Sequence, residues 1–202
     1  MGGPYTSLLI RVIRFTDVNQ SCCSFFVNMR LFIIAASILS ADCSSEVVSA
    51  RVPKSTPVVG SIFSGPGKSG DFRWMADQPE YDRTLFVFND NEEQYFAHLS
   101  GDRRSGCSVG GGNAAVRPLQ CQEPPRAIGI PTGSRGVGYP ALDDRVKSII
   151  DQAVDRIRSL MPAYDQVVFS KDPHSSTLGT GIFKPSEDVK KYIYDSLMDL
   201  SD

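Results

Sequence analysis

The chain has 202 residues, enough for one domain and a tail, and its 41% hydrophobic and 22% charged residues are typical of a globular protein rather than a disordered or fibrous one. Its formal net charge of −2 and pI of about 5.7 exclude a generally basic surface, so we expect no nucleic-acid partner. No apolar run reaches the ~20 residues that a membrane span needs, so we expect no stable membrane span.

Residues 1–50 differ in composition from the rest of the chain and are predicted to be a poorly ordered N-terminal extension. Residues 31–39 form an apolar run with the length of a signal-peptide core, with Met29 and Arg30 before it and small residues after it. One interpretation is a signal peptide over residues 29–50 that begins at Met29 and directs secretion. The other is a cytoplasmic protein whose extension contains a chance apolar segment.

Residues 51–80 are rich in proline, glycine and serine, which is typical of a linker. Within them, Gly67-Lys68-Ser69 is similar to the end of a phosphate-binding P-loop. That loop needs a first glycine five positions before the second, between a strand and a helix. Ile62 occupies the first position, and Gly70-Asp71 begins no helical pattern. We therefore reject a P-loop in this segment.

Residues 81–202 are predicted to form an α/β domain. Runs of strand-forming residues predict strands over 85–88, 127–130 and 164–170. Apolar periodicity and capping residues predict helices over 92–99, 113–117, 143–160 and 186–200. Strands that alternate with helices favour βαβ units, so we expect three layers in which helices flank a mainly parallel sheet.

The triple glycine Gly110-Gly111-Gly112 is the most informative stretch of the chain. Three glycines cost backbone entropy and bring no side chain, so they are expected where the backbone turns sharply or a ligand comes close. Asn113 follows as the cap of a short helix that runs to Arg117. A glycine loop at a helix N-terminus offers free N–H groups to an anion. The alternative is a glycine-rich surface turn.

Polar or glycine-bearing loops follow the predicted strands, and parallel strands all end at one edge of a sheet, where open α/β sheets bind ligands. The alternative for residues 89–91 is a turn rich in Asn and Asp. If the loops converge, the phosphate-bearing ligand contacts Asn89, Asn91, Gly110, Gly111, Gly112, Asn113, Arg117, Thr132, Gly133, Ser170, Gly179, Thr180, Gly181 and Ile182.

Candidate catalytic residues are few. Asp90 and Asp172 are the predicted general bases, and His174 is either an acid or an exposed loop histidine. The chain has two histidines and no Cys-x-x-Cys pair, so we predict no metal site and no cofactor. Cys107 and Cys121 flank the glycine loop and are either free thiols or, in a secreted protein, a disulfide that clamps it.

Four motifs resemble a family of phage and bacterial proteins with the pattern F-G-D-N, G-G-x-A-x-I-R, G-I-P-T-K and G-T-G. They are residues 88–91, 111–117, 129–133 and 179–181, within the stretch 84–200. Asn89 stands in place of a common glycine and Gly133 in place of a common lysine.

The layout is also similar, more distantly, to macro domains, which bind ADP-ribose and in some cases remove it from proteins. This resemblance implies a macro-like or Rossmann-like fold. It also implies that Asn89 or Asn91 faces a distal ribose and that the loops 110–113 and 179–182 grip a diphosphate through N–H groups.

Three functions compete. The first is binding of a nucleotide-type phosphate ligand, similar to ADP-ribose, at the carboxyl-terminal edge of the sheet. The second is hydrolysis of ADP-ribosyl or related nucleotide substrates. The third is a secreted interaction protein on a degenerate scaffold. The sequence leaves open whether the protein is an enzyme and what its oligomeric state is.

Overall fold

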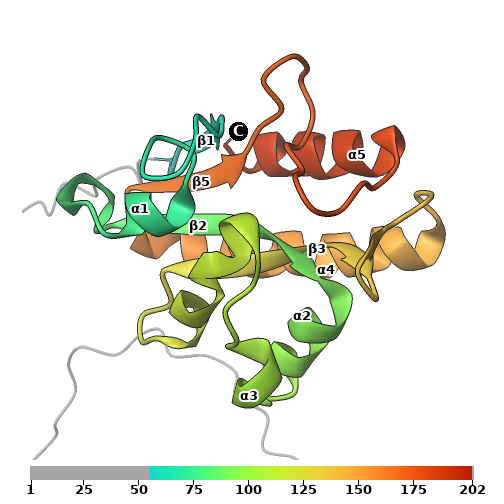
Figure 1. Ribbon diagram of the computed structural model, residues 1–202, viewed down its shortest axis with the longest axis horizontal. Helices are drawn as coiled ribbons and strands as arrows, with labels where there is room; N and C mark the ends of the chain where they lie inside the picture. Colours follow the sequence, from blue (N-terminus) through green and yellow to red (C-terminus); the bar gives the residue numbers. More distant parts are fainter. Residues whose placement is uncertain (1–54, 202) are drawn as a thin grey trace, which may run out of the picture. The chain divides into compact units, whose positions relative to one another are not determined.

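The computed structural model describes residues 55–201 (Figure 1), so the predictions of an N-terminal extension and a signal peptide lie outside the described residues. The strands are β1 (Val58–Ser61), β2 (Thr84–Asn91), β3 (Ala127–Ser134), β4 (Val137–Gly138) and β5 (Gln166–Ser170). The α-helices are α1 (Phe72–Ala76), α2 (Glu92–Leu99), α3 (Arg103–Gly106), α4 (Asp144–Leu160) and α5 (Glu187–Met198). The 3-10 helices are η1 (Pro79–Tyr81), η2 (Gly112–Cys121), η3 (Met161–Ala163) and η4 (Asp199–Ser201).

The strands form one mixed sheet in the order β1-β5-β2-β3-β4. The pairings of β1 with β5, β5 with β2 and β2 with β3 are parallel, whereas β3 and β4 form a short antiparallel hairpin. The carboxyl ends of β1, β5, β2 and β3 therefore share one edge of the sheet. The predicted α/β class, with a sheet flanked by helices, is confirmed (Figure 1).

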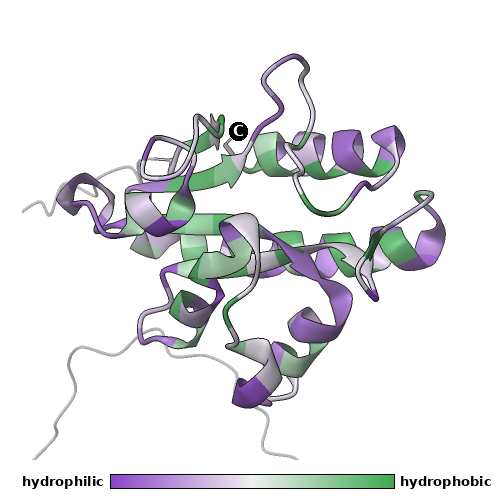
Figure 2. Ribbon diagram, viewed as in Figure 1, coloured by the Kyte–Doolittle hydropathy of each residue, from purple (hydrophilic) through white to green (hydrophobic). Residues whose placement is uncertain are grey.

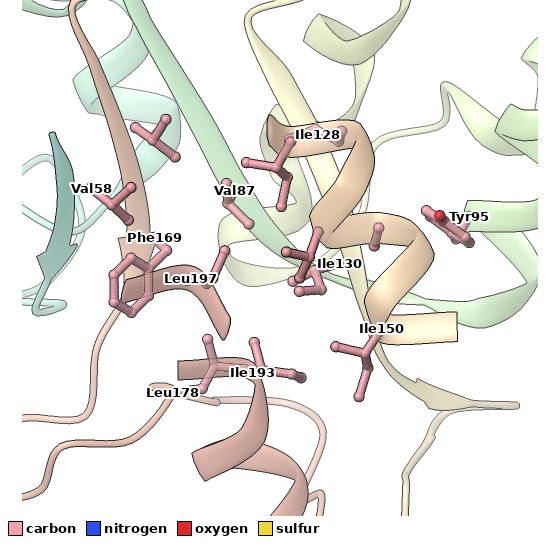
Figure 3. Close-up of a cluster of buried hydrophobic side chains, with 14 of the residues drawn as sticks. Val58, Val87, Tyr95, Ile128, Ile130, Ile150, Phe169, Leu178, Ile193 and Leu197 are labelled. Atoms are coloured by element: carbon pink, nitrogen blue, oxygen red, sulfur yellow. The ribbon is translucent and has the colours of Figure 1, made fainter. Parts of the chain in front are cut away.

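Alternation along β2 supplies both faces of the sheet with core residues. Leu85 and Val87 pack in the larger core, against α4 and α5, whereas Phe86 and Phe88 pack in the smaller one, against α1 and η2. Successive side chains of a strand point to opposite faces, so a continuous apolar run is what a strand buried on both sides requires. Figure 3 shows side chains of the larger core meeting those of the covering helices.

The helix α4 carries the clearest amphipathic pattern of the chain. Val146, Ile150 and Ile157 face the core, while the charged residues between them lie on the solvent side (Figure 2). The side chain of Asp143 caps its first turn by accepting a hydrogen bond from the backbone N–H of Val146, at 2.8 Å. Among the described residues no helix has the length and apolar character to cross a membrane.

Residues 58–61 and 72–76, within the segment whose composition is typical of a linker, form elements of the folded domain. β1 pairs with β5, and α1 places Phe72 and Met75 in the smaller core. Asp71, which the sequence pattern did not indicate as a helix start, is the N-cap of α1. Both elements are short and lie among glycines and prolines, so they have no periodicity to recognise.

Two predicted strands are longer than expected. β2 continues to Asn91 and β3 to Ser134, so Asn89, Thr132 and Gly133 lie within strands rather than in turns after them. Asn and Asp favour turns and proline disfavours strand interiors, but strand pairing overrides these preferences here. The expected helix after the triple glycine is the 3-10 helix η2, which contains Pro118.

Truncation of Phe72 tests whether the segment before residue 81 belongs to the folded domain. Phe72 is fully buried, and its ring centroid lies 5.2 Å from that of Phe86. We expect Phe72→Ala to lower the free energy of unfolding by about 3–5 kcal/mol, measured by urea denaturation. Phe63→Ala, at a position 59% exposed in the same segment, is the matched control and should change it by less than about 0.5 kcal/mol. A loss of unfolding free energy in Phe72→Ala as small as that in Phe63→Ala would mean that the segment does not pack on the sheet.

Candidate functional site

A pocket of about 760 Å³ lies at the carboxyl-terminal edge of the parallel strands. Its wall includes parts of the loops after β1, β5 and α3, together with the last residues of β2. The predicted site residues that line it are Asn89, Asn91, Gly111, Gly112, Asn113, Arg117, Ser170, Asp172, Gly179, Thr180, Gly181 and Ile182. The predicted residues Gly110, Asp90, Thr132 and Gly133 do not line it.

The triple glycine forms a tight turn into η2. The N–H group of Gly110 donates to the carbonyl of Ala114 at 3.0 Å, which draws the chain back on itself, and Gly112 has a φ of +55° that favours glycine. The N–H group of Ala114 donates to the carbonyl of Gly111 at 3.2 Å. The N–H groups of Gly112 and Asn113 lie before that of Ala114, at the start of η2, and so have no acceptor within the helix. Both residues line the pocket.

Asn113 does not cap its own helix, contrary to the prediction. Its Oδ1 accepts a hydrogen bond from the backbone N–H of Phe72 at 3.1 Å, and its Nδ2 donates to Ser170 Oγ at 2.7 Å. One side chain therefore joins the start of η2 to the start of α1 and the end of β5. The glycine loop is thereby fixed to two other elements of the pocket wall.

The second glycine loop, residues 179–182, lies against the end of β5. The N–H group of Gly179 donates to the carbonyl of Ser170 at 2.9 Å, and Asn89 Nδ2 donates to the carbonyl of Gly179 at 2.7 Å. A Cβ atom at Gly179 would lie 2.7 Å from the carbonyl of Lys171, so a larger residue does not fit. A Cβ atom at Gly111 would lie 2.6 Å from Ile182 Cδ1, so the two glycine loops meet.

Arg117 is held beneath the glycine loop rather than offered to a ligand. Its Nε and Nη2 donate to Asp90 Oδ1 at 3.0 and 2.5 Å, and its Nη1 donates to the carbonyl of Ser108 at 2.9 Å. The guanidinium lies over the ring of Phe88, 5.7 Å from its centroid. A Cβ atom at Gly110 would lie 2.8 Å from Nη1, so the loop rests on the guanidinium.

Asp90 is fully buried below the pocket. Even numbering along β2 places it on the same face as Phe86 and Phe88, toward η2 and away from Asn89. Burial raises the pKa of Asp90, while Arg117 and the N–H group of Asn91 oppose that rise. Its Oδ2 has no partner among the described residues. A group enclosed in this way does not reach a substrate in the pocket.

Asp172 lines the pocket, but its side chain is committed to its own loop. Its Oδ1 accepts hydrogen bonds from the backbone N–H of His174 at 2.8 Å and from Ser175 Oγ at 3.0 Å. These bonds, that of His174 above all, hold the pKa of Asp172 below its usual value, which makes it a weaker base. His174 is exposed and is not among the residues that line the pocket.

Thr132 and Gly133 hold the β3–β4 hairpin instead of a ligand. The carbonyl of Thr132 accepts a hydrogen bond from the N–H of Tyr139 at 3.0 Å, and Thr132 Oγ1 donates to the carbonyl of Asp90 at 3.4 Å. A Cβ atom at Gly133 would lie 2.2 Å from the carbonyl oxygen of Val137. The glycine that replaces a common lysine of the resembling family is therefore required by close packing.

Several pocket residues carry no signal that the sequence patterns captured. Lys171 adds a cation, and its aliphatic stem packs on β1, where a Cβ atom at Gly60 would lie 2.8 Å from Lys171 Cβ. Ile62, Phe63 and Pro66 add an apolar wall. These last three lie in the segment expected to be a linker. The available signal was two apolar pairs, Val58-Val59 and Ile62-Phe63, separated by Gly60-Ser61.

Cys107 and Cys121 form a disulfide, with Cα atoms 6.1 Å apart, so they are not the free thiols of the first alternative. The bond joins the residue after α3 to the last residue of η2 and encloses the glycine loop between them. It adds a covalent constraint to the hydrogen bonds of Asn113 and Arg117.

Removing the charge of Asp90 tests the role of the buried pair. We expect Asp90→Asn to lower the free energy of unfolding by about 3–5 kcal/mol, because the charge of Arg117 stays buried without a counter-ion. Asp165→Asn breaks the exposed pair with Arg83 and is the matched control, with an expected loss of about 1 kcal/mol or less. Chemical denaturation of both variants measures the difference. Similar losses would show that the Asp90–Arg117 pair adds nothing beyond a surface contact.

No protein-family model, curated protein or solved structure matches this chain. The likeness to the phage and bacterial family and to macro domains is therefore a resemblance of motifs. What the pocket binds has to be inferred from its geometry and chemistry.

Proposed function

We propose that the pocket binds a nucleotide-type phosphate ligand similar to ADP-ribose. The observation that carries the proposal is the meeting of two glycine loops, 110–113 and 179–182, over one pocket at the strand ends. The volume of about 760 Å³ lies within the range of about 300–1,000 Å³ that is usual for small-molecule sites. Carboxyl ends of parallel strands are where open α/β sheets bind such ligands.

The proposed ligand has a polar part and an apolar part, and the pocket offers both. The N–H groups at the start of η2 and those of residues 180–182 would surround phosphate oxygens, with Lys171 as the nearby cation. Ile62, Phe63 and Ile182 would cover a flat base. A ligand with both a phosphate and a base accounts for both parts of the pocket, because phosphate alone would leave the apolar wall uncovered.

The two asparagines at the end of β2 supply acceptors for the ligand. The Oδ1 atoms of Asn89 and Asn91 are buried and have no hydrogen-bond partner among the described residues, although both side chains line the pocket. A buried acceptor without a partner costs free energy unless a ligand provides a donor. Sugar hydroxyl groups would satisfy both atoms once the side-chain amides turn their enclosed oxygens toward the pocket. This supports the ribose-facing role that the macro-domain resemblance implies.

Binding is favoured over hydrolysis. Asp90 is enclosed beneath the pocket, and Asp172 is hydrogen-bonded within its own loop with a lowered pKa. Neither is placed as a general base toward the pocket. Binding is also favoured over a degenerate scaffold, for which we would expect an occluded crevice at the strand ends rather than a pocket of this size. Secretion is a separate proposal that mass spectrometry of the mature N-terminus tests.

Calorimetry with ADP-ribose tests the proposed function. We expect saturable binding at one site, and weaker binding of inorganic phosphate alone, because phosphate leaves the apolar wall uncovered. NAD, ATP and cyclic nucleotides define which part of the ligand is recognised. Absence of binding heat with all of these compounds would contradict the proposal.

Replacing Lys171 tests which end of the pocket holds phosphate. Lys171→Met keeps the aliphatic stem that packs on Gly60 and removes only the charge. We expect at least about tenfold weaker binding of ADP-ribose, since a hydrogen bond to a charged group is worth about 1.5–3 kcal/mol. Lys184→Met, an exposed position in the same loop that does not line the pocket, is the matched control and should bind as the wild type does. Equal affinities of the two variants would place the phosphates elsewhere.

The hydrolase alternative has its own test. If Asp172 only orders its loop, Asp172→Asn keeps any turnover of ADP-ribosyl substrates, measured by chromatography of the products, and keeps the affinity for ADP-ribose. A loss of turnover by more than about 100-fold with unchanged affinity would instead identify Asp172 as a general base. Ser176→Ala, in the same exposed loop and outside the pocket lining, controls for loop disturbance.

A further inference from the structure

Three side chains of types that bind metals meet at a place that does not include residues lining the pocket. His98 lies in α2, Cys107 directly follows α3, and Cys121 ends η2. The atoms of these residues that bind metals lie within 4.8 Å of one another, and His98 Nδ1 lies 3.7 Å from Cys121 Sγ. The disulfide accounts for the contact of the two sulfurs, but it does not account for the histidine.

Packing of the backbone holds these elements together independently of the disulfide. A Cβ atom at Gly106 would lie 2.4 Å from the backbone nitrogen of His98, so α3 rests directly on α2 and brings Cys107 to the histidine. The buried side chain of Gln120 donates from Nε2 to the carbonyl of Gly106 at 2.5 Å and accepts at Oε1 from the N–H of Gly129 at 3.3 Å. This fixes the neighbouring Cys121 against α3 and β3.

The distances suit a tetrahedral metal. Zinc binds sulfur at about 2.3 Å and nitrogen at about 2.0 Å, which at the tetrahedral angle places sulfur and nitrogen about 3.5 Å apart and two sulfurs about 3.8 Å apart. The separation of 3.7 Å between His98 Nδ1 and Cys121 Sγ already fits. With their Cα atoms 6.1 Å apart, the two cysteine side chains reach the required spacing by rotation once the S–S bond is broken.

We propose that His98, Cys107 and Cys121 form a binding site for a thiophilic divalent cation such as zinc when the disulfide is reduced. A dithiol reduces the disulfide to two thiols and becomes a disulfide itself. The cation then displaces one proton from each thiol and binds the neutral imidazole, with water as the fourth ligand. The site goes beyond the sequence-based prediction of no metal and does not depend on what the pocket binds.

The surrounding charges are compatible with this site. Arg103 Nη2 donates to the carbonyl of Cys121 at 3.0 Å, which places a positive charge beside the thiolates that would form. Two thiolates would in turn balance the charge of the cation.

The consequence is that residues 107 and 121 stay joined under both oxidising and reducing conditions. The disulfide joins them in the first case and the metal in the second. The glycine loop between them therefore keeps its covalent or coordinate clamp whichever compartment the protein occupies.

Cobalt titration of the full chain tests the proposal. The protein is reduced with a water-soluble phosphine, which becomes the phosphine oxide, and Co²⁺ is added as a spectroscopic probe. We expect the d–d bands of tetrahedral cobalt and a thiolate charge-transfer band, at one equivalent, and displacement of cobalt by zinc. The oxidised protein should give neither band, because its sulfurs are in the disulfide. Zinc should raise the melting temperature of the reduced protein only.

Variants assign the ligands. We expect His98→Ala and Cys121→Ser each to weaken cobalt binding to the reduced protein. The loss should exceed the roughly 10- to 100-fold that removal of a residue supporting a metal ligand costs. His174→Ala is the matched histidine control and should bind as the wild type does. A variant with serine at the three cysteines outside the described residues, Cys22, Cys23 and Cys43, should also bind normally.

Three results would overturn the proposal. The first is the absence of tetrahedral cobalt bands in the reduced wild-type protein. The second is a spectrum that survives in His98→Ala and Cys121→Ser but disappears with the three N-terminal serines. The third is that reduction abolishes the native circular dichroism spectrum and that added zinc does not restore it.

Discussion

Arg117 and Asp90 meet where water does not reach, between the end of β2 and the underside of the glycine loop. An ion pair in such a place is costly unless its remaining polar groups are satisfied. The guanidinium meets this condition through the carbonyl of Ser108 and the ring of Phe88, whereas Asp90 Oδ2 has no partner among the described residues. Gly110 then lies directly on the guanidinium. The position of the loop over the sheet edge follows from this pair, and so does the position of the pocket wall that the loop forms.

The other constraints act on the same loop from different sides. Asn113 joins it to α1 and β5, the disulfide closes the segment that contains it, and Ile182 covers it from the second glycine loop. Such redundancy is what a binding site needs, because donors that are fixed before the ligand arrives lose little entropy when it binds. The charged residues thus serve to position backbone N–H groups, and the backbone is the part proposed to hold the ligand.

The sequence predicted the central strands, α2, α4 and α5 and the glycine loops of the site, because these carry long apolar patterns or runs of glycine. It missed β1 and α1, since four or five residues among prolines and glycines show no periodicity. Asp90 was predicted as a base because it follows an apolar run. That role requires β2 to end at residue 88, so that Asp90 lies in the loop after the strand. Pairing with β3 instead extends β2 to residue 91 and places Asp90 within it. The sequence likewise does not show where β3 ends, so it predicts Thr132 and Gly133 in the loop after that strand.

By itself the sequence determined the α/β class, the apolar faces and the chemical types at the strand ends, because these depend on local pattern. Only the tertiary structure decided which of those groups face the pocket. Asn89 and Asp90 are neighbours of similar polarity, yet one lines the pocket and the other is buried beneath it. Alternation along a strand separates them, and the partner of each side chain comes from a segment far along the chain, Gly179 for Asn89 and Arg117 for Asp90. Contacts between such distant segments exist only once the chain is folded.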